Sequence, residues 1–230
     1  MASSGAGLVD RFFPGTGRSY DEVVRFTTLG RDAYWKRRML ARFPPAPKAV
    51  LDLACGTGIV TFDVLRRWPG VKVVGVDVTD DYLAVAREKH RRLGGDVEFI
   101  LGNAETTHVT GPFDVICGSY LPKYVDADRL LENVTPSLRP GGMIVLHDFS
   151  YPHRPLLRVG WEAYFAVLDP VMRVVRPEWA KVFDHSLRDL IRISKWVPCF
   201  RAALTRHGYE YVLVERLTFG GATVVSARKR

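Results

Sequence analysis

Cysteine is scarce in this 230-residue chain, and its three cysteines, Cys55, Cys117 and Cys199, do not stand at a spacing typical of a zinc site. Their odd number and wide scatter also argue against a disulfide framework. No stretch approaches ~18 uninterrupted apolar residues, which excludes a membrane-spanning helix. The first residues lack the basic start and apolar run of a secretory signal. We therefore expect a reduced, cytoplasmic protein that holds no metal.

Long basic runs are also missing, although the formal net charge is +8. Lysines and arginines are spread along the whole chain, and the terminal Arg228-Lys-Arg230 is more typical of a solvated tail than of a nucleic-acid site. Charge of this size affects partners and solubility without identifying a function. We expect no nucleic-acid partner, and anionic lipid headgroups or an acidic substrate explain the charge as well as RNA does.

The most informative segment is an apolar strand that runs into two glycines, Val50-Leu-Asp-Leu-Ala-Cys-Gly-Thr-Gly58. Glycine tolerates positive φ and has no Cβ, so a ligand can lie against the backbone there, facing the N–H groups that open the next helix. A second buried-type strand ends at Asp77, about where nucleotide-binding α/β domains place an acid on ribose hydroxyls. The pair predicts a cofactor site, and its expected members are Asp52, Ala54, Gly56, Thr57, Gly58, Asp77 and Val78.

Two other nucleotide sites are disfavoured by the same residues. A dinucleotide fingerprint needs a third glycine where this chain has Thr61, and Asp52 would repel a pyrophosphate. The segment Gly-x-x-x-x-Gly-Lys-Ser/Thr of a phosphate-binding P-loop does not occur. A cationic sulfonium cofactor tolerates the nearby carboxylate better.

These segments resemble motif I and the acidic loop of class I S-adenosylmethionine (SAM) dependent methyltransferases. The likeness continues in order through Val97–Glu105, Phe113–Ser119 and Leu138–Leu146. It implies a Rossmann-like α/β fold, with a seven-stranded, mostly parallel sheet whose last strand is antiparallel. It also implies SAM as cofactor and S-adenosylhomocysteine as product.

Within that superfamily the chain is most similar to the ubiquinone/menaquinone C-methyltransferase family. The shared segments are Tyr20-Asp21, Trp35-Lys36, Asn103-Ala-Glu105, Asp148-Phe-Ser-Tyr-Pro152 and Leu217-Thr-Phe-Gly220. Carried over by position, the family's SAM contacts fall on Thr57, Asp77, Asn103, Ala104 and Ser119. The family has an arginine where this chain has Lys123, so a planar bidentate donor is replaced by a point charge.

The resemblance implies C-methylation of a prenylated quinol by in-line methyl transfer. Two alternatives stay open: a methyltransferase that acts at C, O or N of another small molecule or lipid, and a non-catalytic SAM-binding subunit. Methylation at a ring carbon needs a base, or a cation that stabilises the phenolate. For these roles we select Asp148 as base or orienter, Lys123 as phenolate stabiliser and His147 as base. For the acceptor pocket we select Tyr20, Tyr120, Tyr124 and Trp161.

The hydrophobic pattern predicts one α/β domain in four parts. Residues 1–47 form a tail and helical arm, with helical spacing over about 20–43, and residues 48–149 form the SAM-binding core. Residues 150–196 form a helical lid, and residues 197–230 form the last helix and the closing strands. Strands are expected near 48–53, 72–76, 96–101, 113–118, 142–148, 210–215 and 222–227.

The lid contains three of the five tryptophans, Trp161, Trp179 and Trp196. We expect helices over Leu156–Leu168 and from Ser186 onward. An ordinary lid helix that buries its apolar face is one reading. The other is a lid that also holds the protein at the inner membrane surface, with its tryptophans near the acyl boundary and its basic residues, among them Arg188, Arg192 and Lys195, near anionic headgroups. The oligomeric state is left open, a homodimer included.

Overall fold

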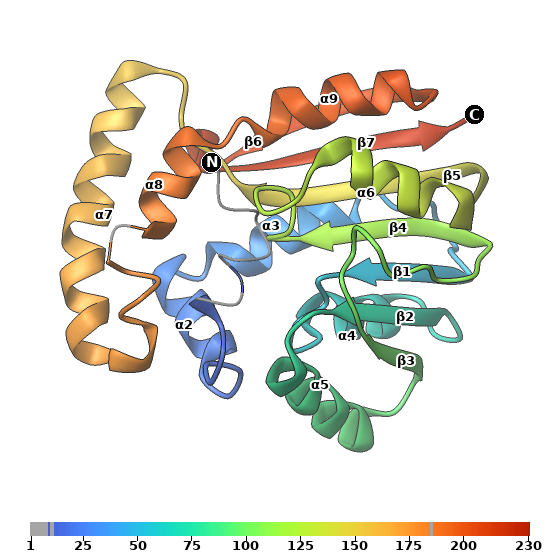
Figure 1. Cartoon of the computed structure of the whole chain (residues 1–230), viewed down its shortest axis with the longest axis horizontal. Helices are drawn as coiled ribbons and strands as arrows, with labels where there is room; N and C mark the ends of the chain where they lie inside the picture. The colour runs from blue at the N-terminus through green and yellow to red at the C-terminus, as the bar shows by residue number, and fades with distance from the viewer. Residues whose placement is uncertain (1–8, 10–11, 185) are drawn as a thin grey trace.

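The computed structural model describes residue 9, residues 12–184 and residues 186–230. Its centre is one seven-stranded sheet with the order β3-β2-β1-β4-β5-β7-β6, in which β7 runs antiparallel to both neighbours (Figure 1). The strands are β1 (Ala49–Leu53), β2 (Lys72–Asp77), β3 (Asp96–Leu101), β4 (Phe113–Ser119), β5 (Leu138–Phe149), β6 (Tyr209–Leu217) and β7 (Ala222–Lys229). The predicted sheet, with its antiparallel last strand, is confirmed.

Helices cover both faces of this sheet. They are α2 (Tyr20–Thr27), α3 (Arg31–Leu40), α4 (Ile59–Arg67), α5 (Asp80–Leu93), α6 (Ala127–Val134), α7 (Pro155–Val175), α8 (Ser186–Ile193) and α9 (Trp196–Arg206). Three short 3-10 turns are η1 (Thr135–Ser137), η2 (Pro177–Trp179) and η3 (Thr218–Gly220). Helices α6 and α9 pack on one face, and α3 and α4 pack on the other. Because β1 and β4 lie between these two layers, their runs of apolar residues are buried on both sides.

A third apolar cluster lies beyond the sheet. It joins α2 to α7, η2 and α8 through Val23, Phe165, Met172, Trp179 and Ile191. Figure 1 shows α7 at the edge of the molecule, on the far side of α8 and α2 from the sheet. The lid and the N-terminal arm therefore share one core.

The helical arm expected over about residues 20–43 consists of α2 and α3. The chain has two helices because Leu29 and Gly30 adopt positive φ values of 51° and 71°, and the Gly30 N–H donates back to the Arg25 carbonyl. Such a left-handed glycine is a common helix stop. The lid helix also runs beyond the expected Leu168, because α7 continues through Pro170, which is exposed.

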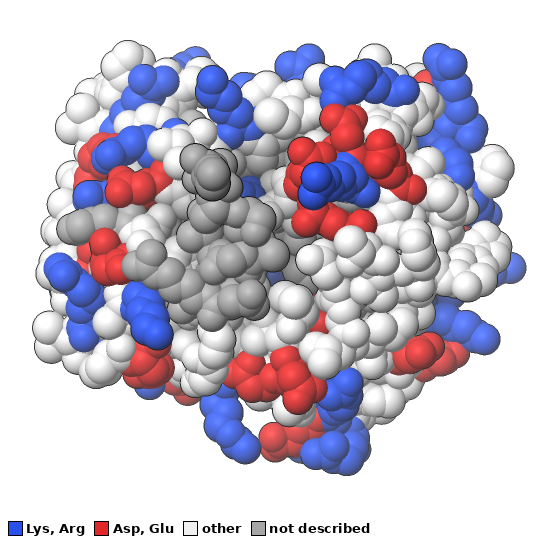
Figure 2. All heavy atoms as spheres, viewed as in Figure 1, with Lys and Arg blue, Asp and Glu red and all other residues white. Residues whose placement is uncertain are grey.

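Charge is mixed over the surface. On the face in Figure 2, lysines and arginines lie among aspartates and glutamates. Within the described residues, no helix is long and apolar enough to cross a membrane.

Candidate active site

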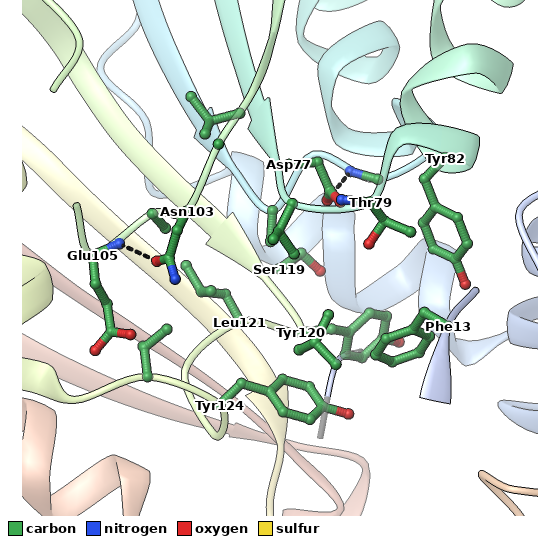
Figure 3. A pocket seen from close by; sticks show the side chains of 18 of the residues that line it. Phe13, Asp77, Thr79, Tyr82, Asn103, Glu105, Ser119, Tyr120, Leu121 and Tyr124 are labelled. Carbon is green, nitrogen blue, oxygen red and sulfur yellow. Dashed lines mark hydrogen bonds between the residues drawn. The ribbon is translucent and has the colours of Figure 1, made fainter. Parts of the chain in front are cut away.

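A cavity of about 100 Å³, called here the first cavity, lies at the carboxyl ends of β1, β2 and β4 (Figure 3). Open α/β sheets bind ligands at this edge. Of the residues predicted to bind the cofactor, seven line the first cavity: Ala54, Gly56, Asp77, Val78, Asn103, Ala104 and Ser119.

Asp77 ends β2 with its carboxylate held at the cavity wall. The Gly56 N–H donates to one carboxylate oxygen at 2.8 Å, and the Thr79 N–H donates to the other at 2.8 Å. Burial raises the pKa of Asp77, and these two donors oppose that rise. The carboxylate is thus fixed in orientation, and each oxygen retains lone pairs for hydroxyl donors of a ligand.

The glycine loop comes next to Asp77. Ala54 and Gly56 have positive φ values of 53° and 56°, which turn the backbone toward the cavity. The opposite wall comes after β3, where the Asn103 side-chain oxygen accepts from the Glu105 N–H at 2.8 Å. The glycine loop and the turn at Asn103 therefore form the two sides of a slot, and Asp77 lies at its base.

Three other residues predicted to bind the cofactor lie behind the glycine loop, outside the cavity wall. Asp52 accepts from the Thr61 hydroxyl at 2.6 Å, and burial raises its pKa to about 6. A Cβ at Gly58 would meet the Phe62 ring at 2.6 Å, so this glycine serves the packing of α4. Thr57 donates its hydroxyl to Asp21 of α2 at 2.5 Å.

The Asp21 contact is part of an N-terminal strap over the cavity. Lys89 of α5 donates to Asp21 at 2.5 Å and to the Thr57 carbonyl at 2.9 Å. Further along the strap, Phe13 lines the cavity and packs edge-on against Tyr82. The arm thus closes the cofactor side of the cavity.

Aromatic rings form the remaining wall. Three of the four residues selected for the acceptor pocket, Tyr20, Tyr120 and Tyr124, line the first cavity. Tyr120 has a positive φ of 64° and donates its hydroxyl to Asp32 at 2.7 Å. The fourth, Trp161, lies elsewhere, in a second cavity beside α7.

Two of the catalytic candidates, Lys123 and Asp148, are paired with each other and lie behind the tyrosines. The Lys123 ammonium donates to Asp148 at 2.6 Å, and their side chains are 2% and 0% exposed. Burial raises the pKa of Asp148, which Lys123 opposes, and burial lowers the pKa of Lys123. The ammonium lies 4.4 Å from the centre of the Tyr124 ring. The pair therefore supports the aromatic wall from behind and does not itself line the cavity.

His147 faces the opposite side of β5 from Asp148, as strand alternation predicts. Its Nδ1 lies 2.9 Å from the Ser119 hydroxyl, and its Nε2 has no hydrogen-bond partner among the described residues. Burial lowers the pKa of His147 well below its ordinary value, with Lys36 and Lys123 adding to the effect. The imidazole is thus neutral, and Ser119 is the member of the pair that reaches the cavity.

Sequence reasoning missed several residues of this site. Phe13, Thr79 and Tyr82 line the cavity, and only Thr79 carried a signal, as the N-cap of the helix after Asp77. Asp32 and Lys36 form a buried ion pair under Tyr120. Their i, i+4 spacing could have indicated that contact.

The chemistry of the residues that line the first cavity suits SAM. Asp77 offers carboxylate lone pairs of the kind that accept from a ribose diol, and the glycine loop allows close backbone approach. The segment Asn103-Ala104 offers a polar edge and a small apolar surface for a base. Among the residues that the structure describes, no lysine or arginine lines the cavity, which suits a cationic cofactor.

Solved structures of SAM methyltransferases have the same fold. A DhpI complex with S-adenosylhomocysteine superimposes with a TM-score of 0.64 at 18% identity, covering 93% of this chain and 91% of that one. The SAM-dependent methyltransferase SibL gives a TM-score of 0.63 at 17% identity, covering 94% and 60%. The fold is therefore that of class I SAM-dependent methyltransferases. The family model described as the ubiE/COQ5 methyltransferase family matches residues 1–229, and the chain belongs to that family.

Curated relatives agree with this assignment. A demethylmenaquinone methyltransferase of Thermus thermophilus is 31% identical over 208 residues, covering 89% of this chain and 94% of the relative. One of Lactobacillus johnsonii is 26% identical over 224 residues, covering 92% and 88%. A ubiquinone/menaquinone biosynthesis C-methyltransferase of Shewanella sp. is 30% identical over 226 residues, covering 95% and 89%.

Proposed function

We propose that this enzyme transfers the methyl group of SAM to a ring carbon of an isoprenoid quinol of the demethylmenaquinol or ubiquinol-precursor type. The observation that carries the proposal is that one cavity has the Asp77 slot at one end and a wall of tyrosines at the other. The names of the relatives point to the same acceptor class. A flat aromatic acceptor packs well against Tyr20, Tyr120 and Tyr124.

The bound cofactor supplies an electrophilic methyl group, so the chain mainly has to align the acceptor and exclude water. The N-terminal strap lines the cavity with Phe13 and Tyr20, and Asp21 ties it to Thr57 of the glycine loop. The Tyr120 hydroxyl is tied to Asp32, which fixes the ring that faces the acceptor. These contacts orient a ring carbon for in-line attack.

The acceptor carbon becomes nucleophilic when a neighbouring phenolic hydroxyl loses its proton. We assign that proton to the Ser119–His147 pair, in which neutral His147 accepts through the Ser119 hydroxyl. After methyl transfer the hydrogen of the methylated ring carbon leaves as a proton and returns to the phenolate oxygen, which restores the aromatic quinol. The ammonium of Lys123, desolvated behind the Tyr124 ring, favours the phenolate electrostatically. Asp148 holds Lys123 in place and is a positioning residue in this scheme.

A membrane contact accompanies the proposal, because a prenylated quinol resides in a bilayer. The expectation that the lid tryptophans meet the membrane is wrong for Trp179 and Trp196, which are 3% and 4% exposed. Helix α7 is the better candidate, since it exposes six large apolar side chains: Leu156, Val159, Val167, Val171, Val174 and Val175. Exposed Arg154 and Arg173 flank it and suit anionic headgroups.

Two tests address the acceptor and the competing functions. Mass spectrometry of quinones from cells that lack this protein should show a quinone one methyl lighter, restored by re-expression. An unchanged quinone profile would exclude the proposed acceptor. A non-catalytic SAM-binding subunit would bind SAM in calorimetry and still form no S-adenosylhomocysteine with any quinol.

A further inference from the structure

The second cavity has a volume of about 410 Å³, and none of its described lining residues lines the first cavity. It lies between α7, α3 and η3, and its wall is mostly apolar, including Trp35, Phe149, Leu157, Trp161 and Phe165. Pockets for small organic ligands typically measure roughly 300–1,000 Å³ and are lined mainly by apolar side chains. The second cavity therefore has the size and chemistry of a ligand site.

Large apolar side chains stand at its mouth. Leu29, Leu156 and Phe219 line the cavity and are 74%, 83% and 79% exposed. Phe219 and its neighbour Thr218 both have positive φ, 58° and 43°, an uncommon conformation for residues with a Cβ. Strain of this kind persists where the surroundings hold it, and here the Trp35 indole donates to the Thr218 hydroxyl at 2.7 Å. The strained backbone at Thr218 and Phe219 thus places an exposed apolar ring at the mouth of the cavity.

The inner end of the second cavity reaches the wall of the first. Phe149 lines the second cavity, Tyr120 lines the first, and their rings stack with centroids 4.8 Å apart. Trp35 packs edge-on against Phe149 at 5.7 Å. This aromatic pair separates the two cavities, and a ligand that spans both would have to part it, with Phe149 moving away from the Tyr120 ring that Asp32 holds.

We propose that the second cavity binds the first isoprene units of the acceptor's hydrocarbon tail while the quinol ring occupies the first cavity. This inference rests on the proposed function. The mouth continues into the exposed apolar face of α7, which runs from Leu156 past Val167 to Val174 at the edge of the molecule (Figure 1). The rest of the tail can stay in the bilayer against that face, so the acceptor need not leave the membrane completely.

Gly160 of α7 offers a clean way to fill the second cavity. It lines the cavity, and a Cβ built there meets no atom within 4 Å. Gly160→Phe should fold, because the substitution also raises helix propensity. Ala166→Phe is the matched control, since Ala166 is exposed on the same helix and does not line the cavity.

The test uses farnesol, a prenyl chain without an acceptor ring, titrated into the protein below the concentration at which farnesol aggregates. Tryptophan emission should report saturable binding, because Trp35 and Trp161 line the cavity. Gly160→Phe should weaken binding at least tenfold, and Ala166→Phe should leave it unchanged. Equal farnesol affinity in Gly160→Phe and wild type, with SAM affinity intact in both, would overturn the proposal. Absence of farnesol binding to wild type would do the same.

Steady-state kinetics distinguish a failure of the tail site from a failure of the proposed function on which it rests. With a long-tailed quinol, Gly160→Phe should raise KM at least tenfold with little change in kcat, and with a tail-less ring it should behave as wild type. If no quinol is methylated, the proposed function fails while farnesol binding still tests the cavity. If quinols are methylated and Gly160→Phe does not distinguish long from absent tails, the tail site alone is wrong.

Discussion

The rings of Tyr120 and Phe149 stack with centroids 4.8 Å apart and form the partition between two cavities. Tyr120 follows β4 and Phe149 ends β5, and these two strands are neighbours in the sheet. The carboxyl edge of the sheet thus places a polar cofactor slot, an aromatic acceptor wall and an apolar cavity side by side. The predictions below test these parts separately.

Asp77→Ala should lower SAM affinity at least tenfold in calorimetry. The variant removes a carboxylate that two backbone N–H groups hold in position, and a hydrogen bond to such a charged group contributes about 1.5–3 kcal/mol. Asp80→Ala is the control, because Asp80 is an exposed acid in the first turn of α5 that does not line the first cavity. Equal affinity in the Asp77 variant and wild type would refute the assigned slot.

Ser119→Ala, His147→Leu and the double variant should each lower kcat by about the same factor, on the order of 10², because a proton relay acts as a unit. Burial depresses the pKa of His147, so the imidazole is neutral at neutral pH. Wild-type kcat should therefore stay flat as pH falls through the ordinary histidine range near ~6.5 and decline only below it. Additive losses in the double variant, or a decline centred above that range, would argue against the relay.

Lys123→Met should lower the free energy of unfolding by about 3–5 kcal/mol, since it leaves the Asp148 carboxylate buried without its partner. The double variant Lys123→Met/Asp148→Leu should recover most of that loss, because it removes both charges together. Lys123→Arg keeps the cation and should lose less stability and retain activity. Thermal denaturation of the four proteins measures this, and a stable Lys123→Met single variant would contradict the pairing.

Val167→Glu/Val174→Glu should reduce co-sedimentation with phosphatidylglycerol-rich vesicles, because both valines are exposed on α7. Leu93→Glu is the control, at the exposed end of α5. Replacing Arg188 or Arg192 by glutamate is a poorer test of membrane binding, because Arg188 pairs with Asp169 and Arg192 pairs with Glu162. The charge reversal would therefore also disturb the lid itself. Equal vesicle binding by the α7 double variant and wild type would remove α7 as the membrane face.

The sheet and the cofactor loop could be predicted because their signals are local. Buried strands such as Phe113–Ser119 appear as continuous apolar runs, and Gly56 with Asp77 shows a characteristic order and offset. The predicted strand positions accordingly fall close to the observed ones.

Tertiary partners could not be predicted in this way. The pairing of Asp21 with Thr57 and Lys89 depends on how the arm folds over the core, and nothing in the local sequence specifies it. Likewise, Asp148 and Lys123 could be placed at one sheet edge, whereas their complete burial against each other depends on Tyr124 and Phe149. Side-chain exposure in the lid also depends on tertiary packing, so the local sequence could not predict that Trp179 is buried while Val174 is exposed.

The most direct test of the account is methyl transfer by the purified enzyme from carbon-13 methyl-labelled SAM to reduced demethylmenaquinol in detergent. The account predicts one labelled methyl per quinol on a ring carbon, seen by NMR, with one S-adenosylhomocysteine formed for each. Label on a quinol oxygen, or SAM that binds without any transfer to the quinol, would contradict it.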